Sequence, residues 1–131
     1  YTLCASLNYG AIMTYVTVIP FLYQGTYHLS PVMFGWLTPF VAVALICGAL
    51  INTQLVKRKG PDKLLVLAAR FMVAAASLML LLGLLGFANV WVVVVPMMFF
   101  VMGTTIVFSN SFAGAFSPFP HAAGIVGALY A

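Results

Sequence analysis

Six uncharged side chains in two apolar segments are the residues of this chain best suited to hold a small molecule. Asn8 and Tyr15 lie seven residues apart, close to two helical turns, so a helix would place them on one face. The second set recurs at helical spacing in a later segment and comprises Met98, Met102, Thr105 and Ser109. Aromatic and thioether groups suit lipophilic and cationic ligands of varied shape. We therefore predict that these residues line a binding surface for small hydrophobic or cationic molecules.

A packing role is the alternative for each of these positions. Asn8 is also a good candidate for a hydrogen bond between two helices in a membrane. The face that carries Met98 and Ser109 could equally be a helix–helix contact. Tyr23 follows Tyr15 by eight residues, but we interpret it as an aromatic residue of the membrane interface.

No pattern in the chain indicates catalysis. We find no nucleophile beside a base, no spacing of metal ligands and no phosphate-binding loop, so we expect neither an enzyme nor a bound metal or cofactor. Proton transfer through an apolar segment requires a titratable side chain within that segment. The chain holds one acid, Asp62, which lies in a polar stretch, and its two histidines lie in predicted turns. The predicted membrane segments 2–24, 31–56, 64–87 and 90–112 therefore hold no Asp, Glu or His that could carry a proton.

Composition places these residues in a membrane protein. Apolar residues make up 65% of the chain and charged residues only 5%, whereas soluble domains carry about a quarter charged residues. Such a chain cannot cover a water-facing surface. The net charge of +4 is concentrated in one short stretch without an aromatic platform, so we expect no nucleic-acid partner.

The apolar segments are long enough for transmembrane helices, which need about 20 residues each. We predict an all-α, polytopic transmembrane helix bundle. Because the first and last residues fall inside apolar segments, we expect the chain to be part of a longer protein. The predicted helices cover residues 2–24, 31–56, 64–87 and 90–112, with a truncated helix from 122.

A basic stretch between the second and third predicted helices sets the orientation. Lys57 and Arg58 begin it, and it also holds Gly60, Asp62 and Lys63. Lysine and arginine near helix ends favour the cytoplasmic side, so we predict that loop 57–63 is cytoplasmic. Membrane topology alone is one explanation for this concentration of charge. The alternative is a gating role, in which Asp62 pairs with a basic residue across a sharp turn at Gly60.

Arg70 is the one cation placed inside a predicted transmembrane helix. It lies seven residues after Lys63, about 10 Å along the helix. Its side chain could extend to the cytoplasmic headgroups, or it could face a partner helix and a missing acid.

The basic stretch resembles a motif of the major facilitator superfamily. Gly48, Asn52, Lys57-Arg58 and Gly60, with the intervening Leu-Val pair, form the pattern G-x3-N-x2-L-V-K-R-x-G. This is similar to the loop between the eighth and ninth helices of those transporters. The resemblance implies that a gating role for this loop would act between two rigid halves that rock against each other.

Three further segments resemble the drug:proton antiporters of the Bcr/CflA type within that superfamily. Pro20-Phe21 followed by L-S-P-x-x-F-G at 29–35 is similar to their seventh helix and the following loop. The segments 89–103 and 116–129 are similar to their tenth helix and to the approach to the eleventh. The resemblance implies that the chain is a fragment of the second six-helix half, whose partners include the missing first-half helices. It also implies that the proton-carrying acid lies in that first half.

This resemblance also implies a function. We expect a transporter of the bacterial inner membrane that exports small hydrophobic or cationic drugs in exchange for protons by alternating access. Two alternatives stay open. One is a carrier of the same fold that moves a nutrient or an organic anion, with a cation in its cavity. The other is a small membrane assembly subunit without transport activity.

Overall fold

The computed structural model describes residues 1–86, 89–117, 124 and 128 of the chain. It confirms the predicted all-α fold, because these residues form four long helices, one of which ends in a π-helical turn. All four are long and apolar enough to cross a membrane. Their bounds are α1 at Thr2–Phe21 with its π turn η1 at Leu22–Thr26, α2 at Pro31–Lys59, α3 at Pro61–Leu84 and α4 at Val90–Phe116.

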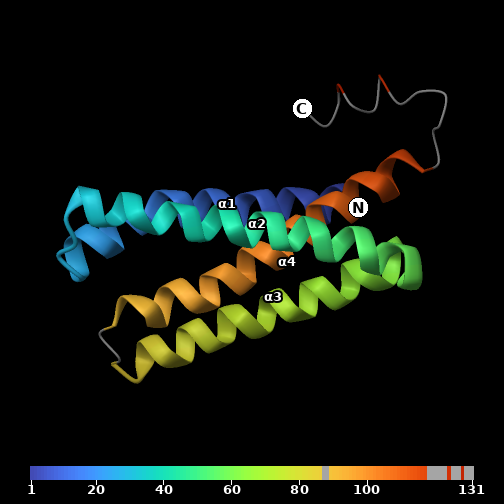
Figure 1. The fold of residues 1–131 in the computed structure, drawn as a ribbon. Helices are drawn as coiled ribbons and strands as arrows, with labels where there is room; N and C mark the ends of the chain where they lie inside the picture. Colours follow the sequence, from blue (N-terminus) through green and yellow to red (C-terminus); the bar gives the residue numbers. More distant parts are fainter. Residues whose placement is uncertain (87–88, 118–123, 125–127, 129–131) are drawn as a thin grey trace.

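Successive helices run in opposite directions, so the bundle has two distinct ends (Figure 1). One end holds η1 and the connection from α3 to α4, and we call it the Tyr23 end. The other holds Tyr1 and the link from α2 to α3, and we call it the Gly60 end. Helix α4 lies at the centre and packs against each of the other three helices. It therefore supplies most of the buried residues of the bundle.

Two polar side chains fix where helices begin at the Tyr23 end. The Oγ of Ser30 accepts a hydrogen bond of 3.2 Å from the backbone N–H of Met33, and Pro31 occupies the first helical position of α2. The Oδ1 of Asn89 accepts a bond of 3.2 Å from the N–H of Trp91 at the start of α4. Both satisfy donors that the first turn of a helix leaves without partners.

The connection between α2 and α3 is shorter than the predicted loop 57–63. Helix α2 continues through Lys59 and α3 begins at Pro61, so that Gly60 alone separates them. Gly60 has a φ of 77°, which glycine adopts without strain. The three basic residues before it lie in the last turn of α2 and Asp62 in the first turn of α3, where each sign complements the helix dipole.

Other helix ends differ from the sequence prediction by a few residues. Helix α3 ends at Leu84 rather than 87, two residues before Gly86, whose φ is 74°. Helix α4 extends to Phe116 rather than 112 and stops just before Ser117, the residue that precedes a proline. The truncated helix predicted from 122 falls outside the continuous part of the chain that the structure describes.

Candidate functional site

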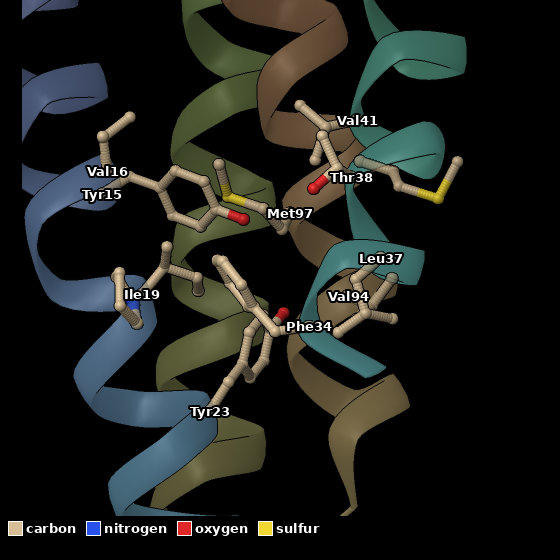
Figure 2. Close-up of a pocket in the computed structure, with 12 residues that line it drawn as sticks. Tyr15, Val16, Ile19, Tyr23, Phe34, Leu37, Thr38, Val41, Val94 and Met97 are labelled. Atoms are coloured by element: carbon tan, nitrogen blue, oxygen red, sulfur yellow. The ribbon is translucent and has the colours of Figure 1, made fainter. Parts of the chain in front are cut away.

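A cavity of about 340 Å³ lies between α1, α2 and α4 toward the Tyr23 end (Figure 2). Tyr15 and Tyr23 enter it from α1 and η1, and Thr38 adds a third hydroxyl from α2. The remaining lining is apolar and comprises Val16, Ile19, Pro20, Phe34, Leu37, Val41, Val94, Met97 and Met98. The volume is at the lower end of the range for small-molecule sites, about 300–1,000 Å³.

Local chain geometry turns Tyr23 into this cavity. The π turn η1 follows Pro20 and has a smaller rotation per residue than an α-helix, which keeps Tyr23 on the side of α1 that carries Tyr15. Tyr23 is only 2% exposed. Its ring packs at a tilted angle against Phe34, with centroids 5.9 Å apart, and against Tyr27 at 6.3 Å. The interpretation of Tyr23 as an interface residue is therefore wrong, because its side chain is buried between helices rather than exposed on the bundle surface.

The chemistry of the cavity follows from this lining. No charged side chain occurs among its described lining residues, and the tyrosine and threonine hydroxyls are its side-chain hydrogen-bonding groups. Aromatic faces and methionine sulfur provide soft, adaptable contacts. The cavity can therefore hold a small lipophilic molecule with one or two polar groups.

The structure brings only part of the predicted binding face to this cavity. Tyr15 and Met98 line it together. Asn8 lies nearer the Gly60 end, where it is 5% exposed and its Nδ2 donates a hydrogen bond of 3.2 Å to the carbonyl oxygen of Thr104. That contact is the helix–helix bond that was considered as its alternative role. Asn8 also borders a second hollow of about 370 Å³ between α1, α3 and α4.

Met102 and Thr105 lie where α4 meets Gly48 of α2. A Cβ atom on Gly48 would be 2.9 Å from the Met102 carbonyl oxygen and 3.2 Å from the Thr105 Cβ. The Thr105 hydroxyl donates to the carbonyl of Val101, 3.1 Å away in its own helix. Ser109 is half-buried one turn further along the same face. These three residues thus lie on the part of α4 that extends from the cavity toward the Gly60 end.

The first two residues of the G-x3-N-x2-L-V-K-R-x-G motif, Gly48 and Asn52, have a physical role at this contact between α2 and α4. Gly48 lets the backbones of α2 and α4 approach closely, as small residues do in membrane bundles. One turn later, Asn52 accepts a hydrogen bond of 2.6 Å through its Oδ1 from the Nδ2 of Asn110. The same Nδ2 also donates to the carbonyl of Ile106 at 2.7 Å, and Asn110 is 1% exposed. Sequence reasoning named Gly48 and Asn52 but missed Asn110, for which helical spacing alone gives no signal.

The charged residues cluster at the Gly60 end, away from the cavity. Lys57 and Arg58 are exposed in the last turn of α2, and Arg70 is exposed on α3. Asp62 accepts a hydrogen bond from the Tyr1 hydroxyl. This bond raises the pKa of Tyr1 above its usual value of 10.0, with smaller contributions from desolvation and from the charge of Asp62. Among the described residues, the structure therefore gives Asp62 a tyrosine partner rather than a basic one.

The fold and the cavity together define the class of membrane protein to which the chain belongs. The described chain is a multi-pass helical membrane bundle with an uncharged, partly aromatic cavity between three of its helices. Among the described positions, no group of three His, Cys, Asp or Glu residues comes together that could hold a metal ion.

Two curated relatives narrow this class. The bicyclomycin resistance protein homolog of Haemophilus influenzae is 26% identical over 129 residues, which cover 98% of this chain and 32% of the relative. The chloramphenicol resistance protein of Pseudomonas aeruginosa is 26% identical over 130 residues, covering 99% of this chain and 31% of the relative. No protein-family model matches the chain, and no solved structure gives a significant match.

The chain is a homologue of these bacterial drug-resistance proteins along nearly its whole length. The resemblance to drug transporters of the Bcr/CflA type that the sequence motifs predicted is thereby confirmed. The chain spans about a third of the length of the curated relatives it matches.

Proposed function

We propose that the protein containing this chain exports small hydrophobic or cationic drugs across the bacterial inner membrane in exchange for protons. Alternating access would expose the cavity first to one side of the membrane and then to the other. The chain would contribute helices of the second half and one wall of the substrate path. The Gly60 end would face the cytoplasm, since the basic residues gather there.

The cavity lined by Tyr15, Tyr23 and Met98 is the observation that carries this proposal. Its apolar walls remove a lipophilic molecule from water, and its few hydroxyls can orient the polar groups of such a molecule. The drugs named by the two relatives, bicyclomycin and chloramphenicol, are the first substrates to test.

The lining argues against an organic-anion carrier of the same fold. Such a carrier needs a cation in its cavity, and Arg70 was the one candidate within a helix. Helix α3, which bears Arg70, contributes no residue to this cavity. An anion placed there would lose its hydration and would gain no charged partner from the residues that the structure describes.

Transport by the intact protein tests the proposal. We would express it in a bacterium that lacks its own drug exporters and measure resistance to chloramphenicol and bicyclomycin, together with efflux of a fluorescent cation such as ethidium. Expression should raise resistance to at least one drug severalfold. A protonophore should abolish the efflux if protons drive it.

A matched pair of variants connects transport to the cavity. Tyr15→Ala removes an aromatic wall, whereas Tyr9→Ala removes a tyrosine of the same helix that is 55% exposed and does not line the cavity. At equal membrane abundance, only Tyr15→Ala should lose resistance. Equal activity of the two variants would mean that the cavity is not the substrate site.

A further inference from the structure

Two basic side chains lie in line on the outer face of α3. Lys63 and Arg70 are separated by seven residues, so they differ by about 20° around the helix and by about 10 Å along it. Both are exposed. The side of α3 that packs in the bundle is marked instead by the buried residues Leu64, Ala68 and Ala75.

The surroundings of this pair leave its charge without a partner. The only acid of the chain is Asp62, and its carboxylate accepts the Tyr1 hydroxyl. No ion pair forms among the residues that the structure describes at this end. Three further cations, at positions 57–59 in the last turn of α2, add to the positive potential. An anion at this surface would therefore meet attraction from both helices.

Exposed apolar side chains lie beside the two cations. Val66 and Leu67 lie between them in sequence, and Val73 follows one turn after Arg70; they are 50%, 44% and 67% exposed. Helical side chains lean toward the N-terminus of their helix, so both charges extend toward the Gly60 end of α3. A ligand here would place a negative group against Lys63 and Arg70 and an apolar part along the helix.

We propose that Lys63 and Arg70 bind the phosphate of an anionic phospholipid, whose acyl chains lie against Val66, Leu67 and Val73. The arginine fork can donate two parallel hydrogen bonds to phosphate oxygens, and the lysine adds a flexible point charge. Free phosphate could use the same donors. The lipid is favoured because the site extends from the first turn of α3 to about two turns inside it, in a helix long and apolar enough to cross a membrane, and because apolar side chains flank it. This site is independent of the drug-export proposal, since it shares no residue with the cavity.

Lipid binding to the intact protein, purified in a neutral detergent, tests this site. We would titrate it with phosphatidylglycerol, with zwitterionic phosphatidylcholine and with inorganic phosphate, and count bound lipids by native mass spectrometry. We expect saturable binding of phosphatidylglycerol, with the other two ligands bound at least tenfold more weakly. Phosphate binding as tight as the lipid would instead identify a free-anion site and overturn the lipid assignment.

Variants that each remove one charge distinguish binding at a specific site from attraction by the general positive potential of this surface. Arg70→Gln and Lys63→Gln should each weaken phosphatidylglycerol binding about fivefold, the loss expected for one basic residue near a membrane surface. Arg70→Lys should keep part of the affinity because it keeps the charge. Lys59→Gln removes the same charge from α2 and should have a smaller effect. Equal losses from Lys59→Gln and Arg70→Gln, or no loss from either, would overturn the site.

Discussion

Replacing Gly48 by alanine should destabilise the bundle, because the added methyl group has no room. Its Cβ would lie 2.9 Å from the carbonyl oxygen of Met102 and 3.1 Å from the Cα of the same residue. These are backbone atoms of α4 and cannot rotate away, so α2 and α4 must separate. Overpacking of this kind costs about 1–3 kcal/mol. The higher helix propensity of alanine offsets about 1 kcal/mol of that cost.

Gly35→Ala is the matched control in the same helix. Apart from the neighbouring backbone of its own helix, no atom lies within 4 Å of a Cβ at position 35, so that variant should show the propensity gain alone. The difference between the two variants isolates the overpacking term, about 2 kcal/mol or roughly 30-fold in the unfolding equilibrium. Gly103→Ala should fall between them, because its methyl group meets the flexible side chain of Met72 at 2.4 Å rather than backbone.

Reversible unfolding of the intact protein in detergent micelles, followed by circular dichroism, measures these differences. The expected order of stability is Gly35→Ala, then Gly103→Ala, then Gly48→Ala. If Gly48→Ala proved as stable as Gly35→Ala, the close contact of α2 with α4 would not exist, and the physical role assigned to the G-x3-N motif would be refuted.

Two other predictions concern the hydrogen bond of Asn110 and the orientation of the bundle. Asn110→Ala should lower the free energy of unfolding by about 1–2 kcal/mol, because it leaves the half-buried Asn52 without its 2.6 Å hydrogen bond. The control, Ser77→Ala, removes an exposed hydrogen bond within one helix and should have almost no effect. The orientation is tested in a variant without other cysteines. Thr26→Cys should react with a membrane-impermeant thiol reagent added to whole cells, and Pro61→Cys should not. The reverse pattern would invert the proposed orientation.

The helices were predictable because their signals are strong and local. Long apolar runs, Pro31 after Ser30 and the break at Gly60 each indicate a boundary by a mechanism that depends on few neighbours. The error at 57–63 arose because polar residues were read as loop. In the structure a single glycine and a proline at the first helical position are enough to turn the chain, and the charges remain helical.

The site was predictable only in part, for a different reason. Helical spacing shows which residues share a face, but it does not show which part of that face meets a cavity. Met98 of α4 lines the cavity together with Tyr15 of α1. Met102 and Thr105 lie on the same face of α4 as Met98, but they contact α2 at Gly48 instead. Tyr23 was assigned to the membrane interface although its spacing from Tyr15 is close to whole helical turns, because the sequence does not show that Phe34 of α2 packs against its ring.

The contact at Gly48 and the cavity are two consequences of how α2 lies against α4. At Gly48 the absent side chain lets the two backbones meet. About two turns away, toward the Tyr23 end, α2 carries Leu37 and Val41 and α4 carries Val94 and Met98, all of which line the cavity. Large side chains there leave space between the helices that the glycine contact does not allow. Separating the helices at Gly48 should therefore change the cavity as well, so that Gly48→Ala should alter drug resistance although residue 48 does not line the cavity.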